Sequence, residues 1–217
     1  MDALTVTAMV LSASPIGEYD NRVVLLTRER GRISAFAKGA KRPKSQLSAV
    51  GPFAYGQFDL HEGATSYTMY AAKVEDYFEG LRTDVEGAYY GFYLLELAQY
   101  LTRENNDEWE MLKTLSAAVR ALEKGVCERE LVRCIFEMRA LSVNGFAPQP
   151  EQLMLDKASE HTLRYACEAP LKQLFAIAVS EEVLQTFRKV NDQVLANVLD
   201  RPMKSLEMIR MISKEVE

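Results

Sequence analysis

Residues 21–48 read NRVVLLTRERGRISAFAKGAKRPKSQLS, and this stretch decides the architecture of the N-terminal part of the chain. It contains a run with four consecutive apolar residues at its centre, residues 22–28, and an alternating run, residues 32–38, which are joined by Glu29, Arg30 and Gly31. Gly31 can adopt a positive φ at little cost, which favours a tight hairpin between two strands. Residues 39–48 combine glycine, proline and cations without apolar periodicity, so they predict a flexible loop.

The same stretch is also strongly basic. It holds eight basic residues and one acid, a net charge of +7, whereas the remainder has 18 basic and 30 acidic residues, or −12. A field of one sign confined to one region indicates a polyanionic partner that meets one face of the protein. The candidate binding residues are these cations: Arg22, Arg28, Arg30, Arg32, Lys38, Lys41, Arg42 and Lys44.

Three further segments, residues 4–12, 52–60 and 66–74, alternate in polarity and predict strands. Five short strands avoid exposed edges most economically in a small closed or partly closed antiparallel barrel. From about residue 80 the apolar period changes from 2 to 3.6, which predicts helices. They are expected over residues 84–101, 107–125, 128–143, 159–175, 180–198 and 204–214. The predicted fold class is therefore α+β, with a barrel domain over residues 1–79 and an all-α domain over residues 80–217.

Aromatic residues accompany the basic stretch. The rings that could stack on bases are Phe36, Tyr55, Phe58, Tyr67 and Tyr70, and of the nearby aromatics Phe36 and Phe53 are expected in the core. A five-stranded barrel with a basic face and a few exposed rings is suited to single-stranded nucleic acid. Two alternatives stay open. The cations could be ordinary solvated positions, or the chain could be an adaptor whose basic barrel docks on an acidic protein rather than on DNA.

Catalytic and metal chemistry has no support in the sequence. The motifs that mark nucleotide loops, metalloproteases and serine hydrolases are missing, so we predict no catalytic residues, no cofactor and no metal. Cys127, Cys134 and Cys167 form no CxxC pair, which indicates a reducing, cytoplasmic compartment. No apolar run approaches the roughly 20 residues that a membrane-spanning helix needs, so no membrane partner is expected.

Residues 27–53, TRERGRISAFAKGAKRPKSQLSAVGPF, resemble the N-terminal signature of the bacterial recombination mediator family RecO. The matching positions are Thr27, Gly31, Lys38, Gly39, Ala40, Lys41, Arg42, Ser45, Pro52 and Phe53. Weaker similarity continues through Phe136 and Glu137, Leu141, residues 145–148, residues 170–175 and residues 204–206.

This resemblance implies an OB-fold barrel, a helical C-terminal domain and a cytoplasmic, nucleoid-associated protein. It also implies binding of single- and double-stranded DNA, annealing of complementary strands, and recruitment by the acidic C-terminal tail of the single-stranded DNA-binding protein SSB. A partnership with RecR in helping RecA displace SSB is implied as well. By position, Lys38, Lys41, Arg42 and Lys44 would belong to the DNA-contacting loop, whereas the strand arginines depend on which face they occupy.

Two expectations concern the helical domain. Many family members carry a four-cysteine zinc site after the stretch that corresponds to residues 145–148, but residues 149–165 contain no cysteine here, so this module is expected to be lost or shortened. An SSB tail needs an apolar pocket rimmed by cations, and the candidates for it are Trp109, Leu112, Arg133, Phe136, Arg139 and Leu141. An ordinary interhelical core with arginines at its surface explains these six residues equally well.

Overall fold

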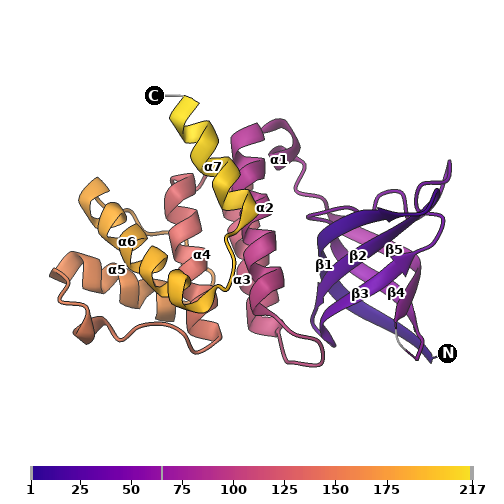
Figure 1. Ribbon diagram of the computed structural model, residues 1–217, viewed down its shortest axis with the longest axis horizontal. Helices are drawn as coiled ribbons and strands as arrows, with labels where there is room; N and C mark the ends of the chain where they lie inside the picture. The colour runs from indigo at the N-terminus through magenta and orange to yellow at the C-terminus, as the bar shows by residue number, and fades with distance from the viewer. Residues whose placement is uncertain (1, 65, 216–217) are drawn as a thin grey trace. The chain divides into compact units, whose positions relative to one another are not determined.

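The computed structural model describes residues 2–64 and 66–215. Five strands close into a barrel in the order β1-β2-β3-β5-β4, as Figure 1 shows. The strands are β1 (Asp2–Ile16), β2 (Asp20–Thr27), β3 (Gly31–Ala37), β4 (Tyr55–Glu62) and β5 (Tyr67–Asp76). Neighbouring strands pair antiparallel, except that β3 and β5 pair parallel and close the barrel. The predicted fold class is confirmed, and the barrel is an OB fold.

The alternation of β3 decides which of its side chains fill the barrel. Ile33, Ala35 and Ala37 are buried, whereas the intervening side chains, Phe36 among them, face outward and are partly exposed. The two alanines leave room for the fully buried ring of Phe58, which comes from β4. The expectation that Phe36 lies in the core is therefore wrong. Phe53 is buried, as predicted.

Residues 38–48, called the basic loop below, are an ordered element rather than a flexible loop. Ala40, Leu47 and the following Val50 are only 3–4% exposed and belong to the barrel's apolar core. The backbone between them follows successive turns, in which the N–H of Arg42 donates to Gly39 (3.0 Å) and that of Ser45 donates to Arg42 (3.1 Å). Apolar periodicity did not reveal this order because the buried positions are spaced irregularly along the turns.

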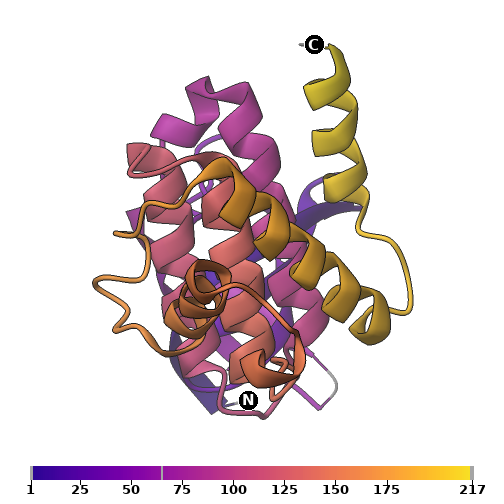
Figure 2. The same cartoon turned by 90° about the vertical axis from the view of Figure 1, so that its left-hand side faces the viewer.

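The rest of the chain is helical. The helices that the structure describes are α1 (Gly80–Thr83), α2 (Val85–Leu101), α3 (Trp109–Lys124), α4 (Arg129–Val143), the 3₁₀ helix η1 (Pro150–Gln152), α5 (Lys157–Glu168), α6 (Glu181–Val198) and α7 (Lys204–Glu215). Ser180 caps α6 as predicted, since its hydroxyl accepts the N–H of Val183. Helices α4, α5 and α6 pack on one another (Figure 2). Across the described residues, no helix is both long and apolar enough to cross a membrane.

The chain divides into two compact units that are not contiguous in sequence. The barrel unit contains Met1–Phe78 and Ala98–Leu112, and the helical unit contains Glu79–Leu97 and Lys113–Glu217. We call Ala98–Leu112 the tip segment, because it joins the end of α2 to the start of α3. The predicted domain boundary between residues 79 and 80 stays a prediction.

Within the barrel unit, the tip segment pairs with the hairpin between β2 and β3. Gly31 forms a β-bridge with Glu104, and the N–H of Arg32 donates to the carbonyl of Arg103 (2.9 Å). The N–H of Asn105 donates to the carbonyl of Arg30 (3.0 Å). A Cβ at Gly31 would lie 2.3 Å from the Arg103 carbonyl oxygen, so this pairing requires a residue without a side chain.

We predict that Gly31→Ala destabilises the protein more than Gly17→Ala does. Both glycines have nearly the same positive φ, +64° and +61°, but a Cβ at Gly17 meets no atom within 4 Å. Gly17→Ala should therefore lower the free energy of unfolding only by the backbone strain, about 1–2 kcal/mol. Gly31→Ala should cost roughly 1–3 kcal/mol more, because the tip segment must shift. Urea unfolding of the two variants measures this difference, and equal stabilities would show that the tip segment is not held at Gly31.

Candidate nucleic-acid interface

The basic loop presents four cations to solvent. Lys38, Lys41, Arg42 and Lys44 are all exposed, although the loop backbone is held against the core. Among the residues that the structure describes, no carboxylate lies within ion-pair distance of the three lysines. The structure therefore brings the four loop candidates together on one ordered segment, where their charge is available to a partner.

Tyr19, in the turn between β1 and β2, contacts this loop and was missed by sequence reasoning. The Arg42 guanidinium lies over the Tyr19 ring, 5.4 Å from its centroid. The backbone carbonyl of Tyr19 accepts the N–H of Lys41 (3.0 Å). The ring is 42% exposed, and hydrogen bonding to Glu18 raises its pKa. An aromatic side chain in a turn was the only available signal for this residue.

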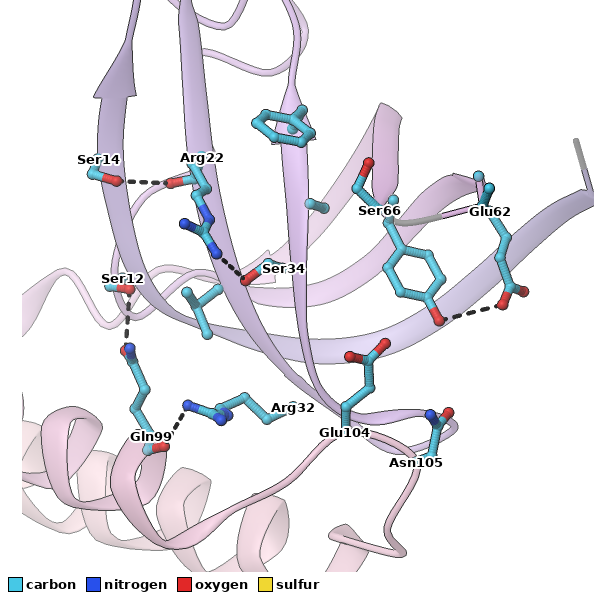
Figure 3. Close-up of a pocket in the computed structure, with 16 residues that line it drawn as sticks. Ser12, Ser14, Arg22, Arg32, Ser34, Glu62, Ser66, Gln99, Glu104 and Asn105 are labelled. Atoms are coloured by element: carbon cyan, nitrogen blue, oxygen red, sulfur yellow. Dashed lines mark hydrogen bonds between the residues drawn. The ribbon is translucent and has the colours of Figure 1, made fainter.

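A second feature is a groove of about 1030 Å³ on the outer face of β1, β2 and β3, which we call the outer-face groove (Figure 3). Its lining comes entirely from the barrel unit: Ser12, Ser14, Arg22, Val24, Arg32, Ser34, Ala35, Phe36, Glu62, Gly63, Ala64, Ser66, Tyr67, Gln99, Glu104 and Asn105. Most of the polar residues are neutral, and nothing in the sequence marks them as a set. In OB folds this face and the adjoining loops bind oligonucleotides and oligosaccharides.

The strand arginines do not share the setting of the loop cations. Arg22 lines the groove and donates to the Ser34 hydroxyl (3.3 Å). Arg32 also lines it and donates to the Gln99 carbonyl (2.9 Å), and burial followed by the charge of Arg103 lowers its pKa.

The other two strand arginines are engaged by neighbouring side chains. Arg28 lies over the Trp109 ring, 4.9 Å from the centroid, and Arg30 pairs with Glu62 at 3.4 Å. The assignment of all eight cations to DNA stays a prediction.

The aromatic candidates are also divided by their exposure. Phe36 is half-buried and lines the outer-face groove, so its ring is accessible from that side. Phe58 is fully buried in the barrel core, which removes it as a stacking candidate. Tyr67 lines the groove but is only 6% exposed, and its hydroxyl donates to Glu62. Tyr70 is 45% exposed, but it stacks on His61 with ring centroids 4.3 Å apart. Tyr55 is partly exposed on β4.

The six candidates for an SSB-tail pocket are mostly inside the protein. Leu112, Phe136 and Leu141 are fully buried, and Arg133 is 3% exposed. Trp109 and Leu112 belong to the barrel unit, while Arg133, Phe136, Arg139 and Leu141 belong to the helical unit. Arg139 is partly exposed and donates to the carbonyl of Ala169. The site stays a prediction, and the burial of Arg133 gives this residue a structural role of its own.

Arg133 neutralises a carboxylate that lies entirely inside the helical unit. Its guanidinium donates to Glu130 and to Glu137, the latter at 2.8 Å. Glu137 is fully buried and also accepts the hydroxyl of Tyr93 (2.5 Å) and the side-chain amide of Asn191 (2.8 Å). Burial raises the pKa of Glu137, and the charge of Arg133 opposes this shift. An isolated charge at this depth would be strongly unfavourable, so the arginine stabilises the folded state.

Metal and thiol chemistry gains no support from the geometry. Among the described residues, no three His, Cys, Asp or Glu side chains are grouped so that they could hold a metal ion. The three cysteines are free, and burial raises the pKa of each thiol, so they remain protonated and weakly reactive near neutrality.

The barrel topology, the basic loop and the outer-face groove define an OB-fold protein with a helical C-terminal part. Two family models match the chain, Recombination protein O N terminal over residues 1–78 and Recombination protein O C terminal over residues 82–152. The chain therefore belongs to the recombination protein O (RecO) family, as the resemblance predicted.

Relatives named DNA repair protein RecO align with this chain, two of them over nearly its whole length. The protein from Clostridium perfringens strain 13 is 25% identical and covers 95% of this chain and 97% of its own length. The one from Acetivibrio thermocellus is 24% identical, with 99% of both chains covered. The one from Alkaliphilus metalliredigens is 35% identical over a shorter region, 64% of this chain and 57% of its own length.

We predict that Arg133→Met destabilises the protein by about 3–5 kcal/mol near pH 7, because Glu137 loses its buried cation. This loss in the free energy of unfolding should become smaller as the pH is lowered toward about 5. The folded variant binds a proton at Glu137, whose pKa is raised, whereas the unfolded chain binds it less, so the variant's stability rises as the pH falls. Urea unfolding followed by circular dichroism at both pH values measures this.

Arg164→Met is the matched control. Arg164 also contacts two carboxylates, those of Glu151 and Glu160, but its side chain is 45% exposed. Its replacement should cost no more than about 1 kcal/mol. A cost at Arg133 that is equally small, or that does not change with pH, would show that Glu137 does not depend on this arginine.

Proposed function

We propose that this protein is a non-enzymatic DNA-binding mediator of recombinational repair. It binds single- and double-stranded DNA and anneals complementary strands. With RecR, it helps to load RecA on SSB-coated DNA. Membership of the RecO family and the names of the relatives support the repair role, and the arrangement of charge on the barrel supports DNA as the partner.

The main support for the proposal is that the basic loop combines exposed cations with an ordered backbone. Four cations stand exposed on a segment whose backbone is anchored by buried apolar side chains. Lysine and arginine that meet phosphates release condensed counterions, and this release dominates affinity for nucleic acid. Because the loop is already ordered, binding does not have to overcome the full entropy of arranging its backbone.

The outer-face groove adds a surface that suits unpaired strands. Phe36 offers a half-buried ring for stacking, and the serines of β1 and β3 offer hydrogen-bonding groups. Stacking on such a ring contributes about 1–3 kcal/mol per base and tolerates any sequence. A duplex keeps its bases stacked inside, so it would use the basic loop alone.

The mediator steps follow from these two surfaces and from the family. Annealing brings two phosphate backbones together, and the cations of the basic loop reduce their repulsion. Recruitment by the acidic SSB tail requires an apolar pocket with a cationic rim.

We predict that replacing Lys38, Lys41, Arg42 and Lys44 with glutamine removes most of the affinity for duplex DNA. If all four contact phosphates, the slope of log K against log salt should become less negative by about 3.6, at roughly 0.9 per contact. Fluorescence anisotropy with a labelled duplex over a salt series measures both quantities.

The control replaces four exposed lysines of the helical unit, Lys124, Lys157, Lys172 and Lys189, with glutamine. Both variants lose four positive charges, which matches their change in net charge. Only the loop variant should show the less negative slope of log K against log salt. If the loop variant binds at full strength, the loop is not the DNA site. Absence of DNA binding by the wild type, together with binding of an acidic protein, would instead favour the adaptor alternative.

Strand annealing on SSB-coated complementary strands tests the mediator step directly. The wild-type protein should accelerate annealing, and the loop variant should not. An acceleration that survives loss of the loop charges would place annealing on another surface.

A further inference from the structure

The outer-face groove has opposite charges on its two sides. Arg22 and Arg32, from β2 and β3, line one side, and in Figure 3 they lie to the left of the two carboxylates. Glu62 and Glu104, from the end of β4 and the tip segment, line the other side. This charge arrangement constrains how an unpaired strand can lie in the groove.

Neighbouring residues hold the two acids of the groove in place. Glu62 accepts hydrogen bonds from the Tyr67 hydroxyl and from Arg30, both at 3.4 Å. Glu104 is exposed, and its backbone is held by the β-bridge to Gly31. Ionised carboxylates only accept hydrogen bonds, and they repel phosphate. A sugar–phosphate backbone is therefore expected along the arginine side, with its bases directed toward the two acids.

The groove is large enough to hold a nucleotide in this orientation. The groove volume of about 1030 Å³ lies just above the range for small-molecule sites, roughly 300–1,000 Å³. A nucleotide has the dimensions of such a ligand, and the ring of Phe36 lines the same groove. A base that stacks near Phe36 would be positioned to present its edge to the opposite side.

The chemistry of the base edges then matters. Adenine, cytosine and guanine carry exocyclic amino groups that donate hydrogen bonds, and carboxylates accept such bonds from cytosine N4. Thymine offers a single ring N–H between two carbonyl oxygens, and those oxygens repel a carboxylate. Two acids at the base side should therefore discriminate against thymine.

We propose that the outer-face groove binds an unpaired strand with its bases toward Glu62 and Glu104, and that these carboxylates favour bases with an exocyclic amino group over thymine. The inference rests on the DNA-binding function proposed above and specifies what this part of the barrel recognises. It assigns Glu104 a role in base preference that is separate from the phosphate contacts of the basic loop.

The test compares oligo-dC and oligo-dT of equal length, about 20 nucleotides, in a mildly alkaline buffer of constant salt. Wild-type protein should bind dC roughly fivefold more tightly than dT by fluorescence anisotropy. Glu104→Gln should reduce this ratio to about twofold or less, mainly through tighter binding of dT, because an amide can donate to the thymine carbonyls.

Glu75→Gln is the matched control. Glu75 is an exposed acid on β5 that does not line the groove, so its replacement changes the net charge equally but should leave the dC-to-dT ratio unchanged. Circular dichroism verifies that each variant is folded. If Glu104→Gln is not folded, Glu62→Gln replaces it with the same expected loss of preference.

The outcomes separate the two proposals. Equal or tighter binding of dT by the wild type overturns this inference, as does a ratio that Glu104→Gln leaves intact. In both cases the salt-dependent binding of the basic loop would stand. No binding of either oligonucleotide by the wild type would overturn both this inference and the proposed function.

Discussion

The segment that carries the cations also contributes apolar side chains to the core of the barrel, and this packing holds the basic loop in place. Ala40, Leu47 and Val50 belong to the same core as the strand residues Leu25 and Ile33. Fully burying a leucine or valine contributes about 1.5–3 kcal/mol, a large share of the stability of a small domain. The loop therefore cannot leave the barrel without loss of core packing. Its lysines consequently project from a fixed backbone.

The sequence predicted the parts of the fold that local patterns determine, and missed those that depend on packing. The hairpin at Gly31, the alternation of β3 and the cap at Ser180 are local, and each is found where predicted. Alternation places Phe36 on the same face of β3 as Arg32 and Ser34, and this polar face is the outer one, so the apolar ring alone was misleading. The inner positions are those of Ile33, Ala35 and Ala37, which pack in the same core as Phe58, and Phe36 lies outside.

The tip segment could not be predicted, because backbone groups hold it in place. The carbonyl of Arg103 and the N–H of Asn105 pair with the hairpin, and every residue except proline offers both of these groups. Side chains add to the contact, since Arg28 lies over Trp109 and Arg32 donates to the Gln99 carbonyl, but neither pair is marked by a local pattern in the sequence. The apolar period changes near residue 80, so the predicted boundary assigns these residues to the helical domain. The groove is missed for the same reason, since Gln99 and Glu104 come from this segment.

The two surfaces of the barrel differ in what balances their charges. The lysines of the basic loop have no carboxylate partners among the described residues, whereas the groove contains two arginines and two acids. Attraction of phosphates by the loop weakens with salt, while stacking and hydrogen bonding in a nearly neutral groove depend on salt much less. In the proposed function a duplex is bound only by the attraction of its phosphates to the loop. An unpaired strand is bound both by this attraction and by stacking and hydrogen bonding in the groove. Raising the salt concentration would therefore shift the balance toward single strands, which gives one barrel a physical means of distinguishing the two forms of DNA.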